Sequence, residues 1–360
     1  MKNYIGDFEK CKDRMMAFWN FDYIGRCALG IDFGARKRVV NKSGNEKFWN
    51  DPDEIVSECM DHIGNYRFFA EGVPHFHINL GPHHAASFFG GKPIYHEYTV
   101  WYDKVIKNLY NFRIAFDETS NIYWNKTINL LKTVVEAVKG DCYVDYTDIG
   151  EPSSILSLLR GTEELCIDLY EEPDAVKRLF EEVNCVVLDL YKKQYDVINK
   201  YLDGCTSGLG LWSPELHLVS EADFASVISP RQAEEFLLPG IQEWCRQAKY
   251  NVYHLDGPPC VKMLDYILEI PELNAIQWPW EIGSEWIGML KRIQSRSKGL
   301  CLYAGKNELD EILSNLSPKG LFVCISDCEN EEQAREIEKI ALNTTAKTSY
   351  FNRHLCALQK

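Results

Sequence analysis

The chain has 360 residues, of which 46% are hydrophobic and 26% charged, and its formal net charge is −14. A chain of this length and composition can bury a large core, which excludes a disordered protein. The acidic balance, without a stripe of lysine and arginine, argues against nucleic acid and anionic membranes as partners. No run of about 18 apolar residues occurs, so we predict no membrane span.

The N-terminal stretch MKNYIGDFEKCKDRMMAFWNF carries charges throughout and lacks the unbroken apolar segment of a signal peptide. The 13 cysteines are odd in number and scattered along the chain, which favours reduced thiols over disulfides. We therefore expect a cytoplasmic protein.

Amphipathic stretches predict helices that alternate with short apolar runs. The first helix is expected at residues 8–20, and Asp51-Pro52 indicates the N-cap and first residue of another. Further helices are expected at residues 125–138, from Thr162, from Glu172 to about Tyr201, after Ser229, and within residues 326–342.

The expected strands are short, rich in β-branched or aromatic residues, and closed by Gly, Pro, Asp or Asn. They cover residues 27–33, 75–81, 142–148, 208–212, 251–257, 274–280, 300–305 and 320–326. Strands separated by helices predict an α/β fold, either a (β/α)₈ TIM-type barrel or a doubly wound open sheet. The length favours the barrel, as one domain over residues 1–360 with an N-terminal helical extension at residues 1–24.

Polar side chains stand at the ends of these expected strands, where a barrel carries its chemistry. The stretch YHLDGPP at residues 253–259 is the clearest example. His254 and Asp256 alternate along a strand and therefore share a face. Two unpaired polar groups inside a barrel mouth would be costly without a role. We predict that both are metal ligands or acid–base groups.

Two other patterns are interpreted structurally. His75 and His77 also share a strand face, and we expect them to pack there. Arg160 is expected to form an ion pair with Asp148 or Glu151.

Three stretches resemble the uroporphyrinogen decarboxylase superfamily: FASVISPRQAEEFLLPGIQEWC, YHLDGP and ILEIPELNAIQW. NLGPHHAASFFGG and TDIGEPSSILSLLRGTEELCIDLYEEPDAV fit the same pattern, so the resemblance covers residues 10–345. More narrowly, the chain is similar to the branch of uroporphyrinogen-decarboxylase-like and corrinoid-dependent methyltransferase-like proteins. The resemblance implies a (β/α)₈ barrel that either decarboxylates a porphyrinogen or transfers methyl groups between corrinoids and thiols.

The chain departs from the decarboxylase pattern at three functional positions. GIDFGARKRVV replaces a motif resembling M-R-Q-A-G-R, although Arg36 and Arg38 are present. Asn79 stands where the decarboxylase carries an aspartate, and the stretch around Cys324 replaces its final histidine. Uroporphyrinogen is therefore not the expected substrate.

The methyltransferase branch holds zinc through His-x-Cys and a cysteine near the eighth strand. In this chain His254-Leu255-Asp256 offers a carboxylate in place of the first cysteine, and Cys324 lies near the last one. Carboxylate oxygen is an accepted zinc ligand, and zinc lowers the pKa of a bound thiol. The resemblance thus implies a zinc site at His254, Asp256 and Cys324.

The first hypothesis is a zinc-assisted methyltransferase that moves a methyl group between a small methylated compound, or a corrinoid, and a thiol acceptor. His254 and Asp256 would be its catalytic groups. The substrate would be bound by Asn79, His83, Asp148, Trp212, Asp223, Gln277 and Arg36. The sequence has no D-x-H-x-x-G motif, so a corrinoid would arrive on a partner protein or as a substrate.

Two alternatives stay open. The chain could be a decarboxylase of another carboxylated substrate, with Arg36, Arg38 and Arg160 as carboxylate clamps and Asp256 as the acid. It could instead be a non-catalytic protein that binds a corrinoid or another small ligand. A monomer and a homodimer are both compatible with the sequence.

Overall fold

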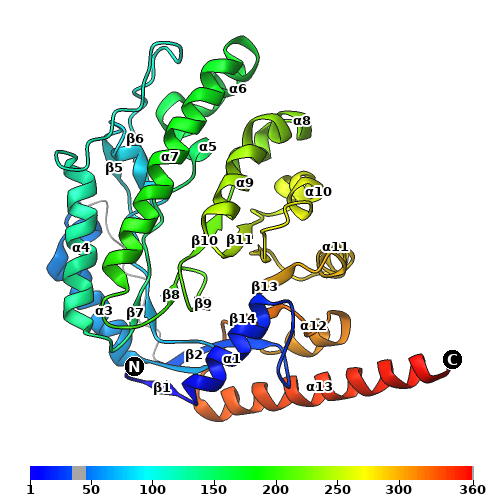
Figure 1. Cartoon of the computed structure of the whole chain (residues 1–360). Helices are drawn as coiled ribbons and strands as arrows, with labels where there is room; N and C mark the ends of the chain where they lie inside the picture. Colours follow the sequence, from blue (N-terminus) through cyan, green and yellow to red (C-terminus); the bar gives the residue numbers. More distant parts are fainter. Residues whose placement is uncertain (35–45, 359–360) are drawn as a thin grey trace.

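A computed structural model describes residues 1–34 and 46–358 of the chain (Figure 1). The strands within these residues are β1 Tyr4–Ile5, β2 Ala28–Gly34, β3 Tyr66–Ala70, β4 His75–Phe76, β5 Pro93–Tyr95, β6 Val100–Tyr102, β7 Tyr143–Val144, β8 Cys205–Thr206, β9 Trp212–Ser213, β10 His217–Ser220, β11 Tyr250–His254, β12 Ala275–Trp278, β13 Gly299–Ala304 and β14 Leu321–Ile325.

The α-helices are α1 Phe8–Trp19, α2 Glu46–Asn50, α3 Pro52–Asn65, α4 Ile122–Val138, α5 Pro152–Arg160, α6 Thr162–Glu171, α7 Pro173–Ile198, α8 Pro230–Gln232, α9 Leu238–Gln247, α10 Leu264–Leu268, α11 Ser284–Ser295, α12 Leu309–Asn315 and α13 Glu331–Leu358. Short 3₁₀ helices cover His84–Ser87, Asp223–Val227 and Pro258–Met263, and a π-helical turn, η3, covers Ala233–Leu237. None of the helices in the described ranges combines the length and the hydropathy of a membrane-spanning segment.

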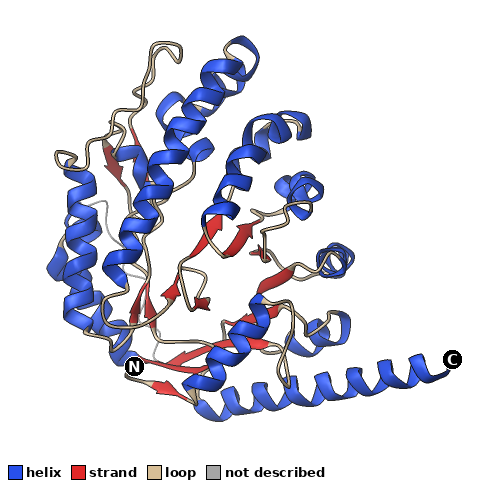
Figure 2. Ribbon diagram, viewed as in Figure 1, coloured by secondary structure: helices blue, strands red, loops and turns tan. Residues whose placement is uncertain are grey.

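Eight of the strands in the described residues form one sheet, in the order β1-β3-β2-β14-β13-β12-β11-β10. Each neighbouring pair from β10 through β14 to β2 is parallel, whereas β2 and β3 are antiparallel. A separate parallel pair joins β4 to β7. Helices lie outside the strands around much of the molecule (Figure 2). The structure therefore has an α/β fold built on a mostly parallel sheet.

The predicted strands at 27–33, 251–257, 274–280, 300–305 and 320–326 correspond to β2 and β11 to β14. The prediction at residues 208–212 is wrong. The chain there turns through Gly210, whose φ is +70°, and forms the tight hairpin β8–β9. The strand that joins the large sheet after this hairpin is β10, which the sequence did not indicate because only two of its four residues, Leu218 and Val219, are apolar.

Helix α1 covers the amino-terminal ends of the parallel strands. Trp19 packs on Tyr250 at the start of β11, with ring centroids 5.2 Å apart, and Phe18 packs on Phe322 near the start of β14. The Nε1 group of Trp19 donates to the carbonyl of Trp212 over 2.9 Å. This end of the sheet is thus closed by apolar side chains, which leaves the carboxyl ends of the strands for a functional site.

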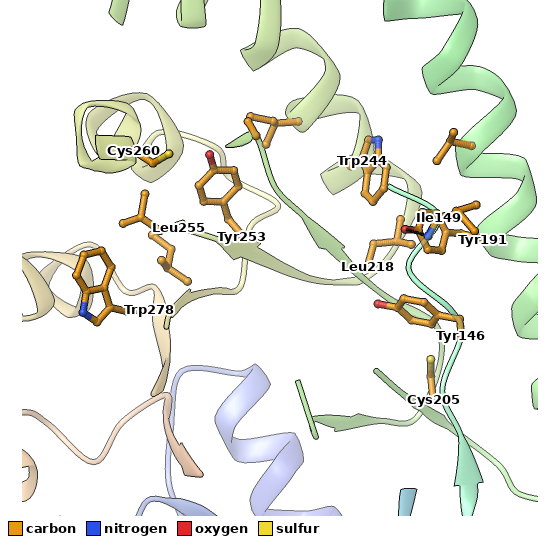
Figure 3. Close-up of a cluster of buried hydrophobic side chains, with 14 of the residues drawn as sticks. Tyr146, Ile149, Tyr191, Cys205, Leu218, Trp244, Tyr253, Leu255, Cys260 and Trp278 are labelled. Atoms are coloured by element: carbon orange, nitrogen blue, oxygen red, sulfur yellow. Dashed lines mark hydrogen bonds between the residues drawn. The ribbon is translucent and has the colours of Figure 1, made fainter. Parts of the chain in front are cut away.

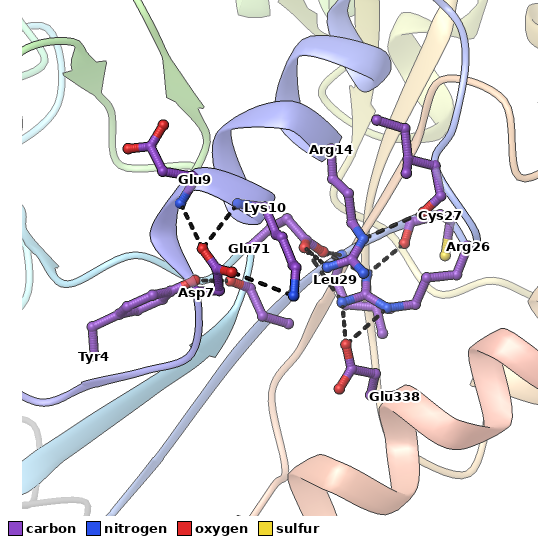
Figure 4. A network of polar contacts seen from close by, with 12 residues as sticks. Tyr4, Asp7, Glu9, Lys10, Arg14, Arg26, Cys27, Leu29, Glu71 and Glu338 are labelled. Atoms are coloured by element: carbon purple, nitrogen blue, oxygen red, sulfur yellow. Dashed lines mark hydrogen bonds and ion pairs between the residues drawn. The ribbon is translucent and has the colours of Figure 1, made fainter.

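A buried ion network fastens α1 and α13 to the same region (Figure 4). Arg26 is fully buried, and its Nη1 donates to Glu71 over 2.6 Å while its Nη2 donates to Glu338 over 2.8 Å. Glu71, also fully buried, accepts from Arg14 of α1 over 3.2 Å and from the backbone of Leu29 over 2.7 Å. Burial of these charges is tolerable because each has an opposite charge and hydrogen-bond partners.

Candidate active site

Three neighbouring parallel strands bring polar side chains together at their carboxyl ends. Glu221 follows β10, His254 ends β11, and Gln277 lies on β12 directly beside His254 in the sheet register. The Nδ1 group of His254 is hydrogen-bonded to Oε1 of Gln277. This contact leaves Nε2 of His254 directed at Asp256, whose Oδ1 lies 3.7 Å away.

His83 joins the site from a turn on the other side. It has a left-handed backbone, with φ of +53°, and a backbone segment at Gly150 lies against it. A Cβ atom at Gly150 would stand 2.6 Å from Cα of His83, so only glycine permits this approach. Nδ1 of His83 then lies 3.4 Å from Oε1 of Glu221, and Nε2 lies 3.7 Å from Oδ2 of Asp223.

Two sets of side chains here have the composition and spacing of metal ligands. Glu221, Asp223 and His254 form one set, and His83, Asp148 and Glu221 form the other. In each set the ligating atoms lie within 4.8 Å of one another, and within the described part of the chain these are the two such sets. Glu221 belongs to both, which makes it the centre of the site.

The charges of these groups are strongly coupled. Burial lowers the pKa of His83, but hydrogen bonding to Asp223 and the charge of Glu221 outweigh it and raise the pKa to about 10. Burial also lowers the pKa of His254, while Asp256 and Glu221 raise it to about 9. Burial raises the pKa of Glu221 to about 8, with a further contribution from Asp148. The charge of each of these groups therefore depends on the charges of the others.

Asp148 is held at the edge of the site. Its Oδ1 accepts from the backbone of Gly150 over 2.7 Å and lies 3.5 Å from the hydroxyl of Tyr191 on α7. Glu151 instead caps α5 by accepting from Ser153 and Ser154. The carboxylate of Asp148 is thus directed toward Glu221 and His83 by the turn that precedes α5.

The predicted pairing of Arg160 with Asp148 or Glu151 is wrong. Arg160 ends α5, and its guanidinium binds Asp168 of α6 over 2.7 Å. Both predicted partners precede α5, and a helix of nine residues separates them from Arg160 by roughly 13 Å.

The other predicted site residues lie in different places. Asn79 is exposed, and its Oδ1 accepts from the backbone of Gly81. Trp212 is buried in the cluster around α1, where its Nε1 donates to Tyr143, so it does not line the carboxyl-end site. Arg36 and Arg38 lie outside the described residues.

Cys324 lies on β14 and lines a cavity of about 320 Å³ together with His75, His77 and Asp32. It belongs to neither of the two ligand sets around Glu221.

His75 and His77 share a face as predicted, but they line this cavity and do not merely pack. Nδ1 of His75 lies 3.0 Å from Oδ2 of the fully buried Asp145, and Nδ1 of His77 lies 3.7 Å from the same oxygen. Burial lowers the pKa of His75, but the charge of Asp145 outweighs it and raises the pKa.

Glu221 is the residue of the candidate site that the sequence analysis did not predict. A signal was present, because Glu221 directly follows β10 and Asp223 lies two residues further along the chain. With only two apolar residues, β10 gave too weak a pattern to mark its carboxyl end.

No family model matches the chain, and no curated protein matches it either. Among solved structures, the chain is similar to a methyltransferase from Methanosarcina mazei, with a TM-score of 0.62 at 10% sequence identity. The similarity covers 95% of this chain and 99% of that one. At this identity the likeness concerns the fold, and the chain therefore shares the fold of that methyltransferase over nearly its whole length.

Proposed function

We propose that the chain is a metal-assisted methyltransferase that moves a methyl group between a small methylated compound, or a corrinoid, and a thiol acceptor. The observation that carries the proposal is the set of Glu221, Asp223 and His254 at the carboxyl ends of parallel strands. The fold likeness to a methyltransferase from Methanosarcina mazei supports it.

We further propose that the strands close into a (β/α)₈ barrel. Support comes from the parallel order of β10 through β14, in which neighbours in the chain are neighbours in the sheet, and from the parallel pairing of the last strand, β14, with β2 near the start of the chain. The parallel pair β4–β7 would complete the ring. The carboxyl ends would then form the mouth, where barrels of this type carry their active sites.

The donor atoms around Glu221 fit zinc. One imidazole nitrogen and two carboxylates make a catalytic-type set that leaves a fourth position for a thiol. A bound zinc would lower the pKa of that thiol and present a thiolate to the methyl group. We propose Glu221 and Asp223 as ligands in place of the Asp256 and Cys324 that the sequence suggested, since neither of those two residues stands in either set. Asp256 and Gln277 would orient the ring of His254.

The remaining residues of the site would donate a proton or contact the substrate. His83 lies 3.4 Å from Glu221 and 3.7 Å from Asp223, so its Nε2 would be placed to supply a proton to a leaving group. Asp148, fixed by Gly150 and Tyr191, would hold the substrate side of the site. A corrinoid would reach this site on a partner protein or as a free substrate. In the decarboxylase alternative, Arg160 could bind a substrate carboxylate only after leaving Asp168.

Metal content of the purified protein tests the proposal. We expect one zinc per chain in the wild type, and loss of zinc in His254→Ala and in Glu221→Gln because each removes a ligand. Glu331→Gln is the matched control, since it removes an exposed carboxylate that pairs with Arg335 on α13. Methyl transfer from methylcobalamin to a small thiol should fall with the zinc. A folded His254→Ala protein with unchanged zinc and activity would refute the proposal.

A further inference from the structure

We propose that a cavity between α7 and α9 binds an apolar chain of the substrate, with a cationic head placed at Glu221. The cavity measures about 320 Å³, and its apolar walls are formed by Phe180, Phe236, Leu237, Ile241 and Trp244. The placement of a reacting head at Glu221 rests on the proposed function, whereas binding of the apolar chain in the cavity is independent of it.

The inner end of the cavity meets the candidate active site. Ser220 and Glu221 line the cavity, and Glu221 is also the residue common to both ligand sets. Glu151 and Ser153, at the start of α5, line the same inner end. A ligand in the cavity can therefore reach the Glu221 carboxylate without crossing another element.

The walls are built to present apolar surface. Nε1 of Trp244 donates to Oδ1 of Asn184 over 2.6 Å, which pairs one polar atom of each wall with the other. Trp244 also packs edge-on against Tyr191, with ring centroids 5.2 Å apart (Figure 3). These contacts hold the tryptophan ring in place, so the cavity is a formed feature of the fold and does not need a ligand to create it.

One wall contains the π-helical turn η3, which lies between α8 and α9 and supplies Phe236 and Leu237. A π turn is an uncommon insertion within a helix and frequently occurs at functional sites. Opposite it, Lys177 of α7 pairs with Glu235 over 2.6 Å and lies over the ring of Phe236. The two walls are thus joined across the cavity by an exposed ion pair.

The charges around the cavity select the ligand. Its lining includes the carboxylates of Glu181, Glu235 and Glu243 but the single ammonium of Lys177. At the inner end, Asp148, Glu221 and Asp223 face His83 and His254. This excess of negative charge disfavours a chain that ends in a carboxylate or phosphate and favours a cationic head. The ligand class is therefore an amphipathic amine, such as an alkyltrimethylammonium compound.

Calorimetric titration with tetramethyl-, butyltrimethyl- and hexyltrimethylammonium tests this assignment, with hexanoate as the anionic counterpart. Each methylene buried in an apolar site strengthens binding by about 4-fold, so the hexyl compound should bind about 15-fold more tightly than the butyl compound. Hexanoate should bind far more weakly. Equal affinities for the butyl and hexyl compounds, or tight binding of hexanoate, would overturn the proposal.

Two variants locate the effect. Ile241→Trp fills the cavity and should abolish the gain from butyl to hexyl while leaving tetramethylammonium binding unchanged. Ile167→Trp is the matched control, because it makes the same change at an exposed position on α6. If Ile241→Trp does not fold, as judged by its melting curve, Lys177→Ala replaces it. This variant removes the exposed ion pair and the contact with Phe236, and it should weaken hexyl binding more than tetramethylammonium binding.

A folded cavity variant that retains the full hexyl preference would refute the assignment. These titrations need neither turnover nor zinc, so their failure is separate from failure of the methyltransferase proposal.

Discussion

Replacing Glu71 by glutamine should destabilise the protein more than any comparable change at its surface. Glu71 is fully buried and accepts hydrogen bonds from Arg26, Arg14 and the backbone of Leu29. Glutamine keeps the shape and one acceptor but removes the charge. Arg26 would then remain buried with only the carboxylate of Glu338, whose side chain is 26% exposed. Breaking a buried ion pair on one side costs about 3–5 kcal/mol, a large part of a typical unfolding free energy of about 5–15 kcal/mol.

Urea unfolding, followed by circular dichroism, measures this cost as a lower midpoint with an unchanged slope. Glu338→Gln is the matched control, because it makes the same chemical change to the other partner of Arg26 at a partly exposed position. We expect it to cost about 1 kcal/mol, as partly exposed pairs do. Equal effects of the two substitutions, or a cost below about 1 kcal/mol for Glu71→Gln, would show that burial does not set the strength of this network.

Three further predictions concern α1 and the candidate active site. Trp19→Ala should lower the unfolding free energy by about 3–5 kcal/mol, because Trp19 is buried against Tyr250; a calorimetric melt unchanged within 2 °C would contradict this. Gly150→Ala should destabilise the chain by about 1–3 kcal/mol and weaken zinc binding, since the new Cβ would meet His83 and φ is +88°; unaltered urea midpoint and zinc affinity would count against it. Burial raises the pKa of Glu221 to about 8 in the folded protein, above its value in the unfolded chain. Between these two values the folded protein holds a proton that the unfolded chain has released. The unfolding free energy of the metal-free protein should therefore fall as pH rises from about 4.5 to 8. Glu221→Gln should remove this decline in urea midpoints measured across that range, and a persisting decline would assign it elsewhere.

The strands whose ends are marked by glycine, proline or a polar residue could be predicted from the sequence. The pattern of YHLDGPP located the end of β11, and the register then places His254 beside Gln277. Both had been predicted as site residues. That the two residues lie side by side could not be predicted from the sequence, because strand register depends on pairing between segments that are distant in the chain.

The partners of the histidines could not be predicted. His83 meets Glu221 only because the chain passes Gly150 at van der Waals distance. His75 faces Asp145 because β4 pairs with β7, and neither strand is longer than two residues. Such contacts depend on tertiary packing, for which local periodicity carries no signal.

The ion network around Arg26 also has a consequence for the order of folding during synthesis. Arg26 and Glu338 are separated by 312 positions in the chain. At about 5–20 residues per second, the ribosome adds Glu338 roughly 15–60 s after Arg26. During this interval Arg26 has Glu71 as a partner but lacks its second carboxylate. Strand β2, which follows Arg26, therefore reaches its full stability only when α13 has been synthesised, so synthesis itself delays the final step of assembly.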